Sequence, residues 1–290
     1  MSTSNSNCVM FSELVIQSPD RARSSKKDPM KKYILTIAAA ALALIACKPD
    51  NGDSTAVAGE IDYIERQIMA GSGAEAFVHH NYVLNFTSDA SGRVTGISEA
   101  HYIAFNPGEQ AEPHSTASLS ITYSGNGGTI ARHSDGSDYE DSFVLNSDGT
   151  LKEFSQEKKY TSTYTYNNGY ITKIQGYDSY SGMDITWNNG DLVKAGSSEI
   201  QYSSDPNPFA GTIDFTASAM NEWYPSPLYF YAVGLFGKHS THLVKSTGSG
   251  DYAVKYEYFK DSKGRIEKIT LSSTYEGVVT IGEQYLIHYK

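Results

Sequence analysis

The feature that most constrains this fold is a repeated strand–turn–strand pattern. The turns contain Asn-Gly at 168–169 and 189–190 and Asp-Gly at 148–149. These pairs favour the positive φ angles that two-residue hairpin turns require. Five segments share the pattern: 82–98 (YVLNFTSDASGRVTGIS), 143–154 (FVLNSDGTLKEF), 164–174 (YTYNNGYITKI), 185–195 (ITWNNGDLVKA) and 256–269 (YEYFKDSKGRIEKI), with turn glycines Gly92, Gly149, Gly169, Gly190 and Gly264. Apolar or aromatic residues alternate with Thr, Lys and Glu around each turn, which predicts an all-β antiparallel meander.

We expect a single β-domain over residues 60–290, joined to the amino-terminal part by a polar tether at 47–59. Glu60 to Ala70 fits either a short strand or a helical turn. One stretch, about 205–245, breaks the hairpin pattern and holds all four prolines of the chain's second half. We interpret it as one long, partly helical connection, because a structureless loop of that length is unusual in a compact domain.

The first 46 residues have the layout of an export signal. From Met30 the chain reads MKKYILTIAAAALALIAC, with two lysines followed by an apolar run from Ile34 to Ile45. This run is too short to span a bilayer as a helix, and a basic start followed by such a run is typical of a signal peptide. We therefore predict a signal peptide at 30–46. Residues 1–29 are polar and unpatterned, which is consistent with a mis-called start codon and a disordered segment.

The end of this signal resembles a lipobox, the cleavage motif of bacterial lipoproteins. Leu44, Ile45 and Ala46 precede Cys47 at the positions of that motif. The resemblance implies cleavage before Cys47, diacylglycerol on its sulfur and further acyl chains of the palmitate type. Several acyl chains anchor a protein far more firmly than one. We therefore expect an outer-membrane lipoprotein of the cell envelope, with a surface-exposed orientation favoured over one that faces inward.

Net charge limits the classes of binding partner, and cysteine content limits the means of stabilisation. Six of the 23 basic and three of the 33 acidic residues precede Cys47, so the remainder carries 17 basic and 30 acidic residues, a net charge of −13. Such a surface repels phosphate backbones, so we predict no nucleic-acid partner. The only other cysteine is Cys8, in the discarded part. The exported domain therefore depends on packing rather than on a disulfide.

Several segments together resemble a known family. These are the Asn-Gly hairpins, NPFAG at 207–211, GLFGKHSTHLVK at 234–245 and the closing KDSKGRIEKI. The combination is similar to the uncharacterised bacterial lipoproteins of domain of unknown function 4595, which have a porin-like fold. That resemblance implies a barrel-like or strongly curved sheet and no activity. The segment 256–269 is also weakly similar to tyrosine-aspartate repeats, although Phe259 stands where aspartate is expected. Charges such as Lys152, Glu153 and Lys173 favour a tethered, water-soluble barrel over an integral pore.

Candidate sites are sparse. We predict no catalytic residues, no metal ligands and no cofactor, since no nucleophile elbow, metalloprotease motif or phosphate loop is present. His239 and His242 are interpreted as loop histidines, His79-His80 as the beginning of a strand, and the acidic run Asp135, Asp138, Glu140 and Asp141 as a solvated turn rather than a Ca²⁺ loop. Most aromatic residues should pack in the core. A ring platform for a glycan or peptide ligand is predicted at Trp223, Tyr224, Tyr229 and Tyr231.

Three functional classes remain open at this point. The leading prediction is a non-catalytic binding or interaction module, tethered to the membrane through lipid on Cys47, with an unknown protein partner. The second is a structural or assembly protein of the envelope that pairs through an exposed strand edge. The third is a hydrolase acting on envelope or dietary polymers, whose carboxylate pair would leave no local sequence signature.

Overall fold

The computed structural model describes residues 61–71, 75–89, 94–134, 136–176, 182–209, 234–248, 253–275 and 278–290. The predicted signal peptide, Cys47 and the tether lie outside these residues. The strands are β1 (Ile61–Ala70), β2 (Phe77–Ser88), β3 (Val94–Ile103), β4 (Glu112–Ser124), β5 (Gly127–Ser134), β6 (Ser137–Leu145), β7 (Leu151–Gln156), β8 (Tyr160–Asn167), β9 (Tyr170–Gln175), β10 (Gly182–Asn188), β11 (Asp191–Ala195), β12 (Ser198–Pro206), β13 (His242–Thr247), β14 (Val254–Lys260), β15 (Ile266–Tyr275) and β16 (Val278–Tyr289).

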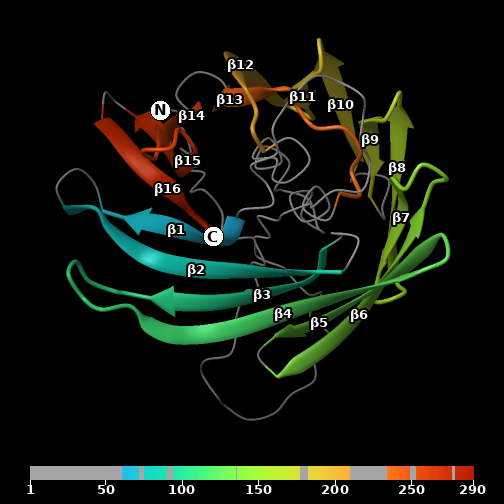
Figure 1. The fold of residues 1–290 in the computed structure, drawn as a ribbon, viewed down its shortest axis with the longest axis horizontal. Coiled ribbons are helices and arrows are strands. Elements are labelled where there is room, and N and C mark those ends of the chain that lie inside the picture. The colour runs from blue at the N-terminus through green and yellow to red at the C-terminus, as the bar shows by residue number, and fades with distance from the viewer. Residues whose placement is uncertain are drawn as a thin grey trace, which may run out of the picture. The chain divides into compact units, whose positions relative to one another are not determined.

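The strands form a closed antiparallel barrel. Each strand pairs with its neighbours in sequence, and β1 pairs with β16 to close the ring (Figure 1). The closing register joins Ile61 to Tyr289 and Arg66 to Tyr285. The predicted meander is therefore confirmed, and of the two predicted forms the structure shows the barrel. All five predicted hairpins are present, and residues 61–70 of the segment for which the sequence left two choices form β1.

On β4, β8 and β10, alternation separates an apolar inner face from a polar outer face. On β4, Ala117, Leu119 and Ile121 are buried, whereas the serine and threonine residues between them are exposed. The same holds on β8 and β10, where Thr and Asp side chains face outward. Transmembrane barrels show the reverse, an apolar band toward lipid. No helix in the described part of the chain has the length and hydropathy needed to cross a bilayer.

Turn chemistry explains the hairpins in more detail. Both residues of each Asn-Gly pair have positive φ: 51° and 81° at Asn168-Gly169, and 51° and 87° at Asn189-Gly190. This is the geometry of a two-residue type I′ turn, as predicted. The Asp148-Gly149 turn differs, because only its glycine has positive φ and the Gly149 N–H donates to the Asn146 carbonyl at 3.0 Å. The prediction of a two-residue turn there was wrong, since Leu145 pairs with Leu151 and the loop is longer.

The long connection between β12 and β13 is shorter than predicted at both ends. Strand β12 continues to Pro206 and β13 begins at His242, so residues 205–206 and 242–245 are strand. The described residues of the connection, 207–209 and 234–241, contain no α-helix. The predicted helical portion falls in 210–233, outside the described residues, and so do Trp223, Tyr224, Tyr229 and Tyr231.

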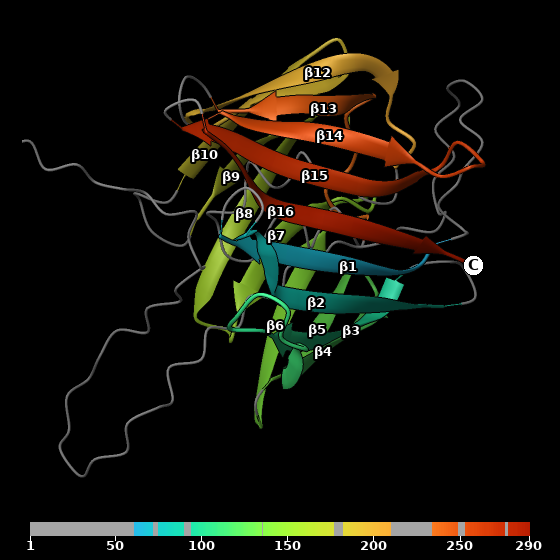
Figure 2. The same ribbon diagram turned by 90° about the vertical axis from the view of Figure 1, so that its left-hand side faces the viewer.

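The barrel has two distinguishable ends and two kinds of wall. The β1 start and the β16 end share one end, together with the even-to-odd turns such as 168–169 and 189–190 and the β12–β13 connection (Figure 2). We call this the tether end, and the opposite one the distal end. Strands β15, β16 and β1–β4 contain 10 to 13 residues, whereas β7–β13 contain five to nine. We call β15, β16 and β1–β4 the long wall and β7–β13 the short wall.

Candidate functional site

The return segment of the long connection, residues 234–241, is the first candidate, and we call it the strap. It lies against three hairpin turns at the tether end. The Leu235 carbonyl accepts a hydrogen bond from the Leu151 N–H at 2.7 Å. The Lys238 N–H donates to the Gly169 carbonyl at 2.8 Å, and the Thr241 N–H donates to the Gly190 carbonyl at 3.2 Å. The two Asn-Gly turns predicted from sequence therefore also provide carbonyl acceptors that hold the strap.

Close packing holds the strap against the short wall. Leu235 and Phe236 are buried, and the Phe236 ring lies 5.4 Å from that of Tyr164. Gly237 adopts φ of 79°, and a Cβ there would collide with the Gly169 carbonyl oxygen. Glycine is required at 237 both for its backbone conformation and for this close approach.

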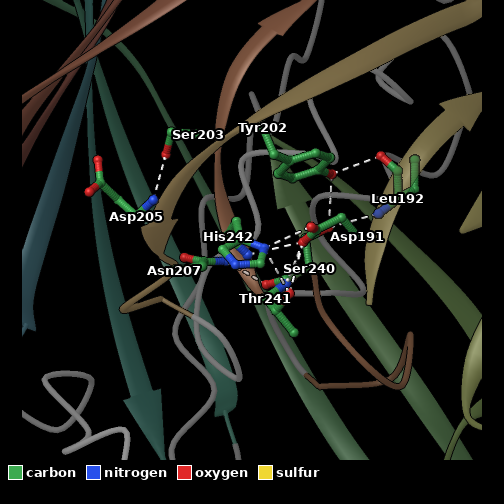
Figure 3. Close-up of polar contacts among 9 residues, drawn as sticks. All are labelled: Asp191, Leu192, Tyr202, Ser203, Asp205, Asn207, Ser240, Thr241 and His242. Carbon is green, nitrogen blue, oxygen red and sulfur yellow. Dashed lines mark hydrogen bonds and ion pairs between the residues drawn. The ribbon is translucent and has the colours of Figure 1, made fainter. Parts of the chain in front are cut away.

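Asp191 fixes the end of the strap (Figure 3). Its Oδ1 accepts hydrogen bonds from the Thr241 N–H at 2.9 Å, the Thr241 hydroxyl at 3.0 Å and the His242 N–H at 3.0 Å. Its Oδ2 lies 2.8 Å from Nδ1 of His242. One carboxylate, with 11% of its side-chain surface exposed, thus satisfies two backbone donors and two side chains. Asp191 immediately follows the β10–β11 turn, so it joins that hairpin to the beginning of β13.

Ser240 and Asn207 complete this network (Figure 3). The Ser240 hydroxyl lies 2.9 Å from that of Tyr202 and accepts from the Leu192 N–H at 3.2 Å. The Asn207 side chain donates to the Ser240 carbonyl at 3.0 Å and accepts from the Phe209 N–H at 3.0 Å. Both ends of the long connection are therefore bonded to each other.

The Asp–His–Ser composition of this network does not have the geometry of a nucleophile triad. In a triad the histidine lies between the carboxylate and the hydroxyl. Here Asp191 and Thr241 share the same nitrogen of His242, and Ser240 is bonded to Tyr202 and Leu192. The network positions the strap. His242 had been interpreted as a loop histidine, but it is the first residue of a strand and has a carboxylate partner.

The acidic run divides into exposed and buried members. Asp138 pairs with His133 and Glu140 with Lys158 on the surface, so both are solvated as predicted, although they lie in strand β6 and not in a turn. Asp141 is 1% exposed and forms a bidentate ion pair with Arg132 inside the barrel. Nε of Arg132 lies 2.7 Å from Oδ2 of Asp141, and Nη2 lies 3.3 Å from Oδ1. The prediction was therefore wrong for Asp141, because strand alternation turns it inward. Asp135 lies outside the described residues.

A shallow groove of about 440 Å³ lies on the outer face of β1–β3. Asn81 donates a hydrogen bond to the Glu65 carboxylate in this groove at 3.1 Å, and Nε2 of His288 lies 3.0 Å from the other carboxylate oxygen. The Tyr63 ring stacks on His288 with centroids 4.1 Å apart. The groove combines aromatic rings with planar polar side chains, and it is lined by Tyr63, Glu65, Asn81, Val83, Tyr102, Gln110 and Ala111.

The interior of the long wall carries a buried ionic cluster. Nε of Arg66 lies 2.5 Å from Oε1 of Glu283, and the guanidinium lies over the Tyr82 ring at 5.6 Å. Burial raises the pKa of Glu99 to about 8, partly opposed by the positive charge of Arg66. Glu99 is therefore largely protonated at neutral pH. Nη1 of Arg66 and Oε2 of Glu99 are both buried without a hydrogen-bond partner.

Four histidines lie beside this cluster at the distal end of β2–β4. Nδ1 of His80 lies 3.0 Å from Nε2 of His101, and the His101 ring stacks on Tyr82 at 4.2 Å. His79 contacts His80 with ring centroids 4.1 Å apart, and His114 contacts His101 at 5.2 Å. Burial, followed by neighbouring imidazoles, lowers the pKa of both His80 and His101 to about 4. Both rings are consequently neutral at pH 7.

Sequence reasoning missed this cluster, which we call the histidine cluster. The dipeptide His79-His80 was interpreted only as the beginning of a strand, which it is. The available signal was two further histidines, because His101 and His114 follow on the next two strands of the meander. Their convergence depends on inter-strand register, which a single sequence does not reveal.

Comparisons with known proteins place the chain in a family. Residues 86–268, more than half of the chain, match the family described as "Domain of unknown function (DUF4595) with porin-like fold". The chain belongs to this family. The resemblance inferred from the hairpins and the strap sequence is therefore confirmed. No protein of curated function matches the sequence.

One solved structure shares the fold of this family member. A porin-like protein from Bacteroides uniformis is similar, with a TM-score of 0.59 and 14% identity, covering 79% of this chain and 96% of that one. A porin-like protein from Bacteroides vulgatus aligns over 79% of this chain and 98% of its own, with 13% identity and a TM-score of 0.30. At such low sequence identity, the similarity to the Bacteroides uniformis protein supports the fold alone. The TM-score of the Bacteroides vulgatus alignment is too low to support the fold.

Proposed function

We propose that this family member is a lipid-anchored protein of the cell envelope whose barrel is a non-catalytic binding module. The observation that carries the proposal is the polar outer face of the strands, combined with the lipobox-like sequence ending at Cys47. A wall with outward Ser, Thr and Lys gains nothing from contact with lipid tails. Attachment then depends on acyl chains at Cys47, as the sequence predicts, in the outer membrane with the domain facing outward.

The barrel's ends suggest an orientation. Strand β1 begins at Ile61, at the tether end, and Cys47 precedes it by 14 residues. A tether of that length keeps the tether end and the strap nearer the bilayer than the histidine cluster at the distal end. Ligands approaching from solution would then meet the distal rim and the outer groove first.

The outer groove supports a glycan as the ligand. Sugars are commonly held by an aromatic ring under the pyranose face and by carboxylates or amides that bond adjacent hydroxyls. Tyr63, Tyr102, Glu65 and Asn81 offer both kinds of group on one surface. The predicted platform of Trp223, Tyr224, Tyr229 and Tyr231 remains a second glycan- or peptide-binding proposal. The assembly alternative loses its stated basis, because all sixteen described strands are paired around a closed ring and leave no edge strand.

The first experiment tests the anchor. Cells expressing the full chain are fed an alkyne analogue of palmitate, with Cys47→Ala as the control, and intact cells are then treated with protease. We expect label and membrane association only with Cys47, and digestion without lysis. Label or membrane association that persists in Cys47→Ala would contradict the anchor. Protection until lysis would contradict the outward orientation.

A second experiment tests the ligand. The full-length protein is applied to an array of bacterial and dietary glycans, beside Tyr102→Ala in the groove and Tyr160→Ala, an exposed tyrosine on β8, as the matched control. We expect glycan binding that Tyr102→Ala weakens at least about tenfold and Tyr160→Ala leaves unchanged, as loss of roughly 1.4 kcal/mol of stacking would give. Equal binding by both variants would remove the groove from the proposal.

A further inference from the structure

Two β-bulges concentrate histidines at the distal end of the long wall. Ile68 pairs with His80 and Met69 with Val78, so His79 is an extra residue in β2. His101 pairs with Ser115 and Tyr102 with Pro113, so His114 is an extra residue in β4. A bulge redirects the side chain that it inserts. Both inserted residues are histidines, and each contacts a histidine that regular alternation already places nearby.

The central nitrogen pair has the spacing of a chelate. Imidazole nitrogens bind Zn²⁺ at about 2.0–2.1 Å, so two of them on one ion lie roughly 3 Å apart. Nδ1 of His80 and Nε2 of His101 are separated by 3.0 Å. Without an ion the two neutral rings share one hydrogen bond, and a tautomer change of one ring supplies the second lone pair. No net proton is released by that exchange.

Hydrogen bonds from the far side of two rings are arranged as they are around metal-binding histidines. Nδ1 of His79 lies 2.6 Å from the Ala104 carbonyl, which only accepts, so Nδ1 carries the proton and Nε2 holds the lone pair. Nδ1 of His101 lies 3.4 Å from the Ser115 hydroxyl, which leaves Nε2 directed at His80. Partners of this kind fix the tautomer and the orientation of ligating imidazoles.

We propose that the histidine cluster is a binding site for a divalent transition-metal ion of the Zn²⁺ or Cu²⁺ type, held by His80 and His101. Imidazole suits both ions. Among the described residues, no three His, Cys, Asp or Glu side chains are already arranged to hold a metal ion. The site is therefore open: the two nitrogens of His80 and His101 bind first, and water, together with rotation of the His114 ring, completes the coordination.

The test uses the full-length protein with a tag that contains no histidine. Zn²⁺ binding is measured by calorimetry, and Cu²⁺ binding by electron paramagnetic resonance in the presence of excess Mg²⁺, which occupies non-specific acidic sites. We expect one Zn²⁺ per chain with a micromolar dissociation constant. The Cu²⁺ spectrum should show hyperfine lines from at least two nitrogens.

Single-residue variants show which histidines bind the metal ion. His101→Asn should weaken Zn²⁺ binding at least tenfold, and His80→Asn should do the same. His133→Asn, an exposed histidine on β5 paired with Asp138, and His242→Asn on β13 are the matched controls and should bind as the parent does. Absence of stoichiometric binding by the parent would overturn the proposal, as would loss of binding in a control variant only. If His101→Asn does not fold, the nitrogen count of the parent's Cu²⁺ spectrum and the His80→Asn variant decide.

Discussion

The two walls of the barrel solve the same packing problem with different chemistry. The short wall, β7–β13, fills its interior with apolar side chains and with the strap, whose Leu235 and Phe236 are buried. The long wall, β15–β16 and β1–β4, keeps Arg66, Glu99 and Glu283 inside, beside the histidine cluster. Sixteen strands enclose more space than strand side chains fill by themselves. One wall meets that demand with a packed segment of the chain, and the other tolerates ionisable groups.

The two walls differ in what their buried polar groups contribute to stability and to function. Buried charge is weak evidence for stability, because desolvation offsets much of the attraction within a pair. The short wall is therefore where we expect structural networks such as Asp191, and the long wall is where ionisable groups persist at a cost. Perturbed pKa values cluster at functional sites. The long wall is therefore the better place to look for a functional site.

The largest effect should come from breaking the long wall's ion pair. Arg66→Met leaves Glu283 without its partner inside the barrel, and we expect a loss of about 4 kcal/mol in the free energy of unfolding. Denaturant titration measures it. Lys158→Met, which breaks the exposed pair with Glu140, should change stability by less than about 0.5 kcal/mol. Equal losses in the two variants would show that the long wall's cluster is not effectively buried.

Glu99→Gln tests the burial of ionisable groups in the long wall through the pH dependence of the free energy of unfolding. The carboxyl keeps its proton up to about pH 8 when folded, whereas its ordinary pKa is 4.5. Between these values the unfolded chain has released the proton and the folded chain holds it, so parent stability falls as pH rises. Glutamine removes that dependence. We expect the variant's advantage in the free energy of unfolding to grow from near zero at pH 4 to several kcal/mol above pH 8.

The pH series should be recorded for both proteins under identical conditions. His80 and His101, whose pKa values lie at about 4 when folded, contribute in the opposite direction: parent and variant both lose stability as pH falls from 6.5 to 4. The difference between the two curves isolates Glu99. A flat difference would mean that Glu99 is ionised in the folded barrel.

On the short wall, Asp191→Ala should have a somewhat smaller effect. It leaves the Thr241 and His242 N–H groups without their carboxylate acceptor, and we expect a loss of about 2 kcal/mol. Asp261→Ala, in the β14–β15 turn, removes a carboxylate that also accepts two backbone hydrogen bonds but holds no strap. Asp261→Ala should lower the free energy of unfolding by less than Asp191→Ala does. Hydrogen exchange would show faster exchange at 234–242 in Asp191→Ala alone, and unchanged exchange there would contradict the strap's dependence on Asp191.

Much of the architecture was predictable because it is encoded locally. Alternation and the Asn-Gly turns predicted hairpins, and both Asn-Gly turns have the expected positive φ. The Asp148-Gly149 turn was predicted with too short a loop, since aspartate-glycine fits more than one turn type. The helical expectation for part of 205–245 remains a prediction within 210–233, although β12 and β13 extend into the predicted connection from both sides.

The sites were far less predictable. Asp141 looked solvated in an acidic run, but alternation turns it inward to Arg132. Asp191 carried no motif at all, because its partners lie some fifty residues later in the chain. The lipidation and cleavage residues, and the four aromatic residues proposed to bind ligand, lie outside the described residues and stay predictions.

By itself, the sequence determined where strands turn, which face of each strand is apolar and that the strands follow one another as a meander. Those properties depend on residues within a few positions of each other, so local sterics and periodicity suffice. The tertiary structure decided that the sheet closes between β1 and β16, that the strap lies against three turns, and that two bulges bring histidines together. Each of these depends on register between distant strands, where a shift of one residue would turn every side chain to the other face.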